Sequence, residues 1–331
     1  MAETDFGALS SNQKKIWSAA VYQAGREQSF WLSGNNSFMG KGMADSSKPI
    51  SYITELTKTE RGDQCIMPLV LDLEDDGVVD DFELEGTEEA LISDTQTLRI
   101  AQLRKAVKNK GKMSDQRTVL RFLDVARNTL GFWQSDLTDQ LMFLVASGIG
   151  FDKRTDGSSR AATSSLPSLS FNADVTAPSS ARILYAGAAT SQATLTASDK
   201  MSVEGLHRLK AHAMRQRIKP IMSGGRAYYF VVMSTEQERD LKLDPIYRTT
   251  LNNAGVRGSN NELFKGGFAE IDGLVLYSAQ KVTTTLGLPS GQKWGVGQTV
   301  NGARALLVGA QALGYALVQA PEWLEIGRAH V

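Results

Sequence analysis

The sequence predicts an α+β protein in which extended segments lie on either side of one unusually long helix. The helix is predicted over Ser114 to Ser147, where apolar residues recur at helical spacing. Ser114 fits an N-cap and Gly148 fits the stop. At about 1.5 Å per residue this helix would be roughly 50 Å long, which exceeds the width of an ordinary small domain. We therefore expect it to serve as a spine with sheet lying along it.

Composition restricts the possible function classes. The 36 Lys and Arg residues equal the 36 Asp and Glu residues, and this balance argues against a dedicated nucleic-acid binder. The single cysteine, Cys65, excludes an internal disulfide and fits a reducing cytoplasm. No apolar run approaches the ~20 residues that a membrane helix needs, so no membrane partner is expected. The polar first residues do not resemble a signal peptide.

Residues 1–49 are expected to form an arm rather than a domain. Lys14 to Phe30 fits an amphipathic helix that carries Trp17, and the aromatic pair Phe30-Trp31 ends it before glycine-rich breaks. Large aromatic side chains on an arm need a surface on which to be buried. Two alternatives are open for Trp17, Phe30 and Trp31, namely the core of their own chain and a neighbouring subunit.

The next segment predicts a strongly polarised extended hairpin. Strand patterns cover residues 50–56 and 65–73, and Pro68 within the second favours an edge strand. Acids crowd residues 72–89, no Lys or Arg occurs between Arg61 and Arg99, and basic residues then follow together. Such a charge run is commonly a solvated loop, whereas complementarity would steer it to a basic surface elsewhere. The candidate inter-subunit contacts here are Asp75, Asp76, Asp80, Asp81, Glu83, Arg104, Lys105 and Lys108.

Part of this hairpin comes close to a calcium-binding loop. Its acids approach the EF-hand template, with the match made by Asp72, Asp76, Asp80 and Glu83, and only Glu74 departs from it. An EF-hand needs a helix that enters the loop, but the preceding residues are β-branched and apolar and include Pro68. No metal site is therefore expected. A calcium-binding protein or enzyme that uses this loop is kept as an alternative.

The second half of the chain predicts alternating loops, helices and strands. A Ser/Thr-rich excursion covers residues 152–178, and the strongest strand covers residues 227–234. Residues 301–318 fit a packed helix or buried strands equally well. The remaining expected elements are a short strand at 182–187, a helix at 201–216 capped by Thr196 or Ser198, a helix capped by Ser234 or Thr235 and ended by Pro245, and a hairpin at 268–282 turning at Asp272-Gly273.

The chain carries no recognisable catalytic motif. It contains no nucleophile elbow, Walker loop, dinucleotide-binding fingerprint, H-E-x-x-H or C-x-x-C. His207 and His212 are five residues apart on one predicted helix, a spacing that does not bring both to one metal ion. We therefore expect no catalytic residues, no cofactor and no enzyme activity.

Several segments together resemble a known family. They are L-E-G-T-E-E-A-L at 84–91, G-K-M-S at 111–114 with Gln116, the long helix, V-V-M-S-T-E-Q-E-R-D-L at 231–241, G-G-F-A-E-I-D-G-L-V-L-Y at 266–277 and N-G-A-R-A-L-L-V-G-A-Q-A-L-G-Y-A at 301–316. In this order they resemble the tailed-phage (Caudoviricetes) major capsid proteins typified by coliphage N-four, over about residues 50–150 and 180–318. The resemblance implies the Hong Kong 97-like coat fold.

The resemblance also implies a division of the chain. It places an N-arm at residues 1–49, a peripheral-domain strand at 50–59 and an E-loop at 60–112. The peripheral domain would cover 113–198, with the spine helix at 114–147 and the Ser/Thr-rich excursion. The axial domain would cover 199–300, and a return segment would cover 301–331.

As a function, the resemblance implies a structural protein of the virion that self-assembles into hexamers and pentamers of an icosahedral shell around double-stranded DNA, without sequence specificity. Each E-loop would lie over an adjacent subunit. The implied partners are further copies of the chain, a portal protein and a decoration protein, with assembly in the cytoplasm of a bacterial host. The sequence departs from the family pattern in two ways: no long helical N-terminal extension is identified, so a separate scaffolding protein is expected, and no cross-linking Lys and Asn pair is identified, so non-covalent stabilisation is expected. The alternative within the same fold is an encapsulin-like compartment shell. The last six residues, 326–331, also match the in-frame translation of a common sequencing adapter, so we expect the natural C-terminus to differ.

Overall fold

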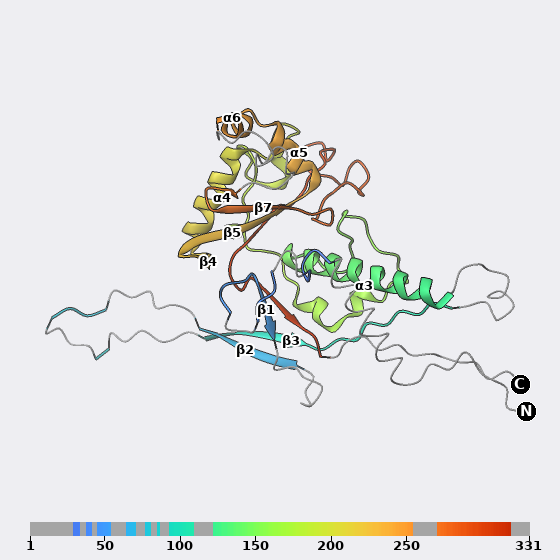
Figure 1. The fold of residues 1–331 in the computed structure, drawn as a ribbon. Helices are drawn as coiled ribbons and strands as arrows, with labels where there is room; N and C mark the ends of the chain where they lie inside the picture. The colour runs from blue at the N-terminus through green and yellow to red at the C-terminus, as the bar shows by residue number, and fades with distance from the viewer. Residues whose placement is uncertain are drawn as a thin grey trace, which may run out of the picture.

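The computed structural model describes residues 29–33, 38–41, 45–53, 64–70, 77–80, 85–86, 93–108, 122–253 and 270–318. Two groups of elements are visible in Figure 1. The lower group contains the long helix α3 (Phe122–Ala146), and the upper group contains a mixed sheet with α4 (Val203–Arg215), α5 (Thr235–Leu243) and α6 (Pro245–Asn253). The fold is therefore of the mixed α+β class that the sequence predicts.

Helix α3 confirms the body and the end of the predicted spine. Its predicted start at Ser114 lies outside the described residues, but its last residue is Ala146. The chain then turns at Gly148, whose φ of +62° favours glycine. A Cβ atom at this position would lie 2.4 Å from the carbonyl oxygen of Thr176, so the close approach of the following loop also requires glycine.

The upper sheet is organised around β5. This strand, Arg226–Met233, is parallel to β7 (Leu274–Ser278) and antiparallel to β4 (Ile221–Ser223) and β8 (Leu306–Val308), and β6 (Glu270–Ile271) pairs with β7. The β4–β5 turn uses Gly224 and Gly225, both with positive φ, which is a backbone conformation that tight hairpin turns require.

Strand β5 contributes to two cores because alternate side chains point to opposite faces of a sheet. Tyr229, Val231 and Met233 pack with the helices α4, α5 and α6 in one cluster. Phe230 and Val232 join a second cluster with α3, the N-terminal segment and β8. The second cluster is therefore where the upper group of elements is held to α3.

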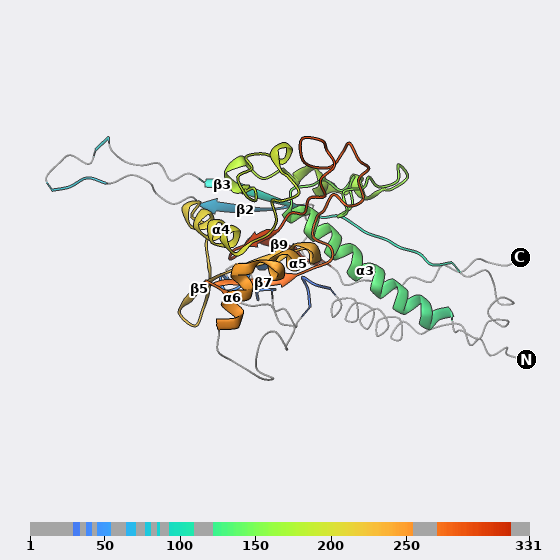
Figure 2. The ribbon, with the colours of Figure 1, turned by 90° about the horizontal axis from the view of Figure 1, so that it is seen from above.

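The lower group contains two small sheets. Strand β1 (Ile50–Ile53) is parallel to β9 (Leu313–Ala316), while β2 (Gln64–Val70) is antiparallel to β3 (Ser93–Arg99). Pro68 pairs with Thr95 in this two-stranded sheet, so the prediction of an edge strand is confirmed. Figures 1 and 2 show that the described far end of this hairpin, residues 77–80 and 85–86, lies well away from the rest of the described chain.

The other predicted elements have mixed outcomes. Ser234 caps α5 through a capping box with Gln237, and Asp272-Gly273 forms the β6–β7 turn, as predicted. Residues 301–318 form the strands β8 and β9, which settles the choice between helix and strand.

Two predictions about local structure are wrong, and one helix was not predicted. Residues 182–187 form no strand, because the chain there leaves a short 3-10 helix at Ser180–Arg182 and stays irregular. The N-cap of α4 is Ser202 rather than Thr196 or Ser198, because the Ser202 hydroxyl accepts from the amide of Gly205. Helix α6 was not expected, although Pro245 both ends α5 and suits the first position of a new helix.

The Ser/Thr-rich excursion after α3 is an irregular path rather than a regular element. It contains the short 3-10 helices at Leu166–Ser168 and Ser170–Asp174, and a further one follows at Gln192–Thr194. Within the described residues, no helix is both long and apolar enough to cross a membrane.

Candidate functional site

The first described residues of the arm are buried in the core of their own chain. Trp31 is only 1% exposed and Phe38 is fully buried. The Trp31 ring lies 5.0 Å from that of Phe143 on α3, and the Phe38 ring lies 4.9 Å from that of Tyr277 on β7. Phe30 packs on the same cluster in a T-shaped arrangement with Trp31, at 5.2 Å.

A buried carboxylate on α3 fixes the direction of this segment. Asp139, 4% exposed, accepts hydrogen bonds from the Ser29 hydroxyl at 2.6 Å and from the backbone amide of Phe30 at 2.8 Å. The amide of Trp31 lies at 3.4 Å from the same carboxylate. Because hydrogen bonds to an ionised acceptor are stronger than neutral ones, Asp139 holds the start of the described arm on the spine helix.

These contacts bear on the two alternatives that the sequence leaves open for the aromatic residues of the arm. Of the two alternatives for the arm, burial in the same chain is the one that the structure shows for Trp31 and Phe30, because their rings already face Phe143. Trp31 therefore has almost no surface left for a neighbouring subunit. Trp17 lies outside the described residues.

The acidic part of the hairpin is described only in part. Asp80 is exposed and has a φ of +53°, whereas six acids named above lie outside the described residues, namely Asp72, Glu74, Asp75, Asp76, Asp81 and Glu83. Strand β2, rather than a helix, precedes them, so the entering helix of an EF-hand is absent at Gln64–Val70. Over the residues that the structure describes, no three His, Cys, Asp or Glu side chains come together as a metal site would need.

The basic limb that follows β3 is exposed and runs beside α3. Arg104, Lys105 and Lys108 are all exposed. The ammonium of Lys105 lies 5.6 Å from the ring centre of Trp133 on α3, within the range of a cation–π interaction. At the start of the limb, Arg99 pairs with Asp174 at 3.6 Å.

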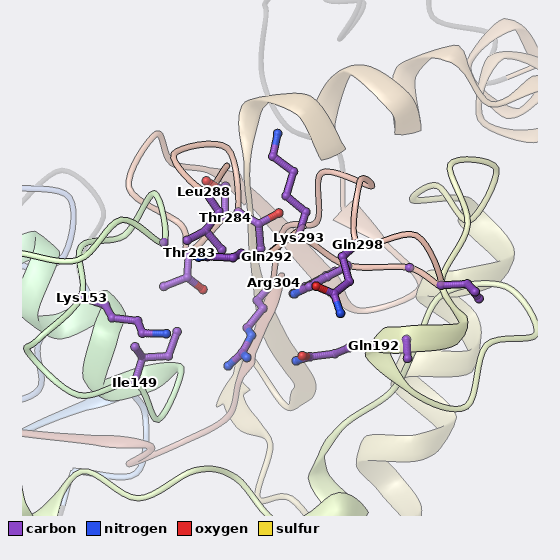
Figure 3. A pocket seen from close by; sticks show the side chains of 16 residues that line it. Ile149, Lys153, Gln192, Thr283, Thr284, Leu288, Gln292, Lys293, Gln298 and Arg304 are labelled. Carbon is purple, nitrogen blue, oxygen red and sulfur yellow. The ribbon is translucent and has the colours of Figure 1, made fainter. Parts of the chain in front are cut away.

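A cleft of about 500 Å³, lined by both polar and apolar residues, lies where the end of α3 meets two loops. It is lined by Ile149, Lys153 and Gly157 after α3, by two residues of the 3-10 helix at Gln192–Thr194, and by residues of the loop from Thr283 to Arg304. In Figure 3 the side chains of Lys153, Gln192 and Arg304 point toward one another across the cleft, while Lys293 points away. The Lys293 ammonium instead binds the side-chain oxygen of Asn301 at 2.6 Å.

Backbone hydrogen bonds tie the walls of this cleft together. The amide of Thr284 donates to the carbonyl of Thr155 at 2.7 Å, and the amide of Gly295 donates to the carbonyl of Gln192 at 3.0 Å. Gly302 permits the closest approach, because a Cβ atom there would lie 1.8 Å from the Trp294 ring. Backbone hydrogen bonds therefore fix the three walls of the cleft relative to one another.

Arg304 sits on the floor of the cleft. Its Nη1 donates to the carbonyl of Ser147, at the carboxyl end of α3, at 3.1 Å, where the helix dipole favours a cation. Burial lowers the pKa of the Arg304 guanidinium from its usual value, but an arginine remains charged. No carboxylate is among the described residues that line the cleft.

The two histidines of α4 are surface residues, as predicted. The Nδ1 of His207 lies 3.4 Å from a carboxylate oxygen of Asp272, and the Nε2 of His212 lies 2.7 Å from the carbonyl of Ala181. A hydrogen bond from Lys210 is the main cause that lowers the pKa of Asp272. The histidines thus bind separate partners and do not form one centre.

Sequence reasoning missed Phe38, Asp139 and the cleft. Asp139 carried a usable signal, because a carboxylate among the apolar residues of a spine helix must either face solvent or find donors. The cleft carried none, since its three walls are far apart in the sequence and each contributes ordinary polar residues.

Comparisons with known proteins agree with one another. A family model described as phage capsid protein matches residues 5–322. The chain is 38% identical over 332 residues to the major capsid protein of Pseudomonas phage KPP25, which covers 97% of this chain and 86% of that protein.

Solved structures give the same picture. The chain is similar to the capsid of Ralstonia phage GP4, with a TM-score of 0.67 and 29% identity over 88% of this chain and 78% of that one. It also shares its fold with the capsid asymmetric unit of cyanophage Pam1, with a TM-score of 0.59 and 18% identity over 74% of this chain and 68% of that one.

Proposed function

The chain belongs to the phage capsid protein family, and from this premise we propose how it acts as a major capsid protein. Copies of the chain, which has the Hong Kong 97-like coat fold, assemble into hexamers and pentamers of an icosahedral shell that encloses double-stranded DNA. The observation that carries this proposal is the 38% identity to a major capsid protein over nearly the whole chain. It is supported by the TM-score of 0.67 to a solved phage capsid.

The domains are assigned on the same basis. We propose an N-arm at residues 1–49, an E-loop at 60–112, a peripheral domain at 113–198 with α3 as its spine, and an axial domain at 199–300. The sheet around β5 and the helices α4 to α6 fit the axial domain, since they form a core of their own. Residues 301–318 fit the return segment, because β8 pairs with β5 and β9 pairs with β1.

The E-loop is proposed to contact an adjacent subunit. Its acids would form polar contacts across the interface, including Asp75, Asp76, Asp80, Asp81 and Glu83, and Trp17 would contact the neighbour from the arm. Exposed ion pairs contribute only about 0 to 1 kcal/mol each, so we expect them to set register more than strength. The exposed cations Arg104, Lys105 and Lys108 are proposed for the same role on the return limb.

The remaining partners follow from a shell that packages DNA. We propose a scaffolding protein, a portal protein and a decoration protein, with assembly in the cytoplasm of the bacterial host. The balanced charge of 36 basic and 36 acidic residues argues against a dedicated nucleic-acid binder. We therefore propose that the shell encloses the DNA without recognising its sequence.

The alternatives have less support. The relatives are phage capsid proteins, which favours a structural role without enzyme activity and gives no support to an encapsulin-like compartment. A calcium-binding function lacks the entering helix that an EF-hand needs.

Electron microscopy of the purified protein tests the proposal. The chain is expressed alone and together with a candidate scaffolding protein from the same genome. We expect closed shells of uniform size, at least in the second sample. Monomers or irregular aggregates in both samples would contradict the proposal.

A further inference from the structure

The cleft at the end of α3 brings two positive charges together, and no acid is among the described residues that line it. Figure 3 shows the ammonium of Lys153 and the guanidinium of Arg304 converging on one space, with the amide of Gln192 on the opposite wall. Asp156 is close in the sequence, but its carboxylate is turned to Ser158, from which it accepts the amide at 2.9 Å and the hydroxyl at 2.6 Å. Two like charges that point together repel each other, and an anion between them removes the repulsion.

The donors in the cleft suit an oxyanion. A guanidinium carries five N–H donors. In Arg304, one of them donates to the carbonyl of Ser147. The planar fork of arginine matches the two oxygens of a carboxylate, and a lysine ammonium and a glutamine amide add further donors. Arg304 is held in position by its bond to the end of α3, so the donors are arranged before any ligand arrives.

The richest source of carboxylates in the sequence is the acidic run of the E-loop. Residues 72–89 contain the densest acids of the chain, and no Lys or Arg lies between Arg61 and Arg99 to neutralise them. A DNA phosphate is less suitable, because nucleic acid is usually bound along an extended basic groove, whereas this cleft of about 500 Å³ lies among short loops.

We propose that the cleft of Lys153, Gln192 and Arg304 binds carboxylates of residues 72–89 from a second copy of the chain. This inference rests on the proposed function, because it names the surface that receives the E-loop. The copy must be a second one, since Figures 1 and 2 show the described far end of the hairpin on the opposite side of the molecule from the loops that line the cleft.

A zero-length cross-link tests the contact in assembled particles. A water-soluble carbodiimide joins a lysine amine to a carboxylate only where the two are in contact. Trypsin then releases all acids of residues 72–89 in one fragment, 62–99, because the chain has no cleavage site between Arg61 and Arg99. We expect this fragment to be joined through Lys153 to the fragment 128–154.

Isotope mixing shows whether the link joins two copies. Shells assembled from equal amounts of ¹⁵N-labelled and unlabelled protein should give cross-links that join a heavy fragment to a light one. Links that are only heavy–heavy or light–light would overturn the proposal, as would shells in which Lys153 is linked only to other acids or to none. A sample that forms no shells overturns both this inference and the proposed function.

Matched variants separate the contact from general charge effects. Lys153→Arg keeps the charge but lacks the amine, so shells should form without this cross-link. Lys153→Glu should raise the subunit concentration needed for assembly roughly two- to fivefold. Arg154→Glu changes the charge equally on an exposed neighbour that does not line the cleft, and it should leave assembly unchanged. Equal effects of the last two substitutions would contradict the proposal.

Discussion

The start of the arm and the β2–β3 hairpin both carry residues that the sequence suggests for contacts between subunits, yet the structure treats them differently. The aromatic rings of Phe30 and Trp31 are placed against Phe143 in their own chain. The far end of the hairpin, including Asp80, is exposed and distant from the body in Figures 1 and 2. The two protrusions therefore differ in how much of their stabilisation their own chain supplies.

The difference follows from the chemistry of the side chains. Burying a large apolar side chain stabilises a fold by about 1.5 to 3 kcal/mol, so an aromatic pair close to the body is covered by the nearest apolar surface. Burying a charge without a partner is costly, so an acidic run stays in solvent until a cationic surface is offered. Aromatic residues on an arm thus indicate anchoring, and a one-sign charge run on a hairpin indicates a contact made later.

The largest expected effect comes from emptying the anchor. Trp31→Ala should lower the free energy of unfolding of the unassembled protein by about 3 to 5 kcal/mol, because a 1% exposed ring leaves a cavity. Urea unfolding followed by circular dichroism measures it. Phe132→Ala is the control, since this ring on α3 is 57% exposed and its loss should have little effect. Similar losses in both variants would mean that the arm is not anchored in this way.

The next effect concerns the carboxylate that orients the arm. Asp139→Asn should destabilise the unassembled protein by about 1 to 3 kcal/mol, because an amide cannot accept from Ser29 and Phe30 as a carboxylate does. The same unfolding measurement applies. Asp136→Asn, on the exposed side of α3 and paired with Lys281, should cost no more than about 1 kcal/mol. An Asp139→Asn protein as stable as the parent would show that the backbone amides find other partners.

Sequence reasoning predicted those parts of the fold that depend on local pattern. The end of the spine at Gly148, the cap at Ser234 and the turn at Asp272-Gly273 each follow from one or two residues with a definite backbone preference. The resemblance extended this to the whole fold because several segments agreed in order.

What the sequence could not predict depends on contacts between distant segments. Asp139 finds its donors in Ser29 and Phe30, which are 110 and 109 residues away in the sequence. The choice between helix and strand for residues 301–318 was decided by β5 and β1, which offered free edges to β8 and β9. The cleft forms only where three segments that are distant in the sequence come together. Neither residue spacing nor composition could therefore indicate it.

A smaller effect is expected on the hairpin side of the comparison. Lys105→Gln should lower the free energy of unfolding by only about 0.5 to 1 kcal/mol, because the cation–π contact with Trp133 is exposed. Lys108→Gln is the matched control, since its ammonium has no aromatic ring beside it in the described part of the chain. If Lys105→Gln lowered the free energy of unfolding more than Asp139→Asn does, the limb would be anchored as firmly as the arm. The contrast between the hairpin and the arm would then not hold.

The smallest expected effect concerns the arm, at the exposed turn before β1. A hydrogen bond from the Ser47 hydroxyl at 2.5 Å, with the amides of Lys41 and Ser47, lowers the pKa of Asp45 from 3.8 to about 2. Because the folded pKa is the lower one, this carboxylate favours the folded turn above about pH 4, and the contribution disappears as the pH falls toward 2. Carbon NMR of the Asp45 carboxyl group should show its midpoint rise toward 3.8 in Ser47→Ala and stay unchanged in Ser46→Ala. An unchanged midpoint in Ser47→Ala would show that the backbone amides alone hold the carboxylate.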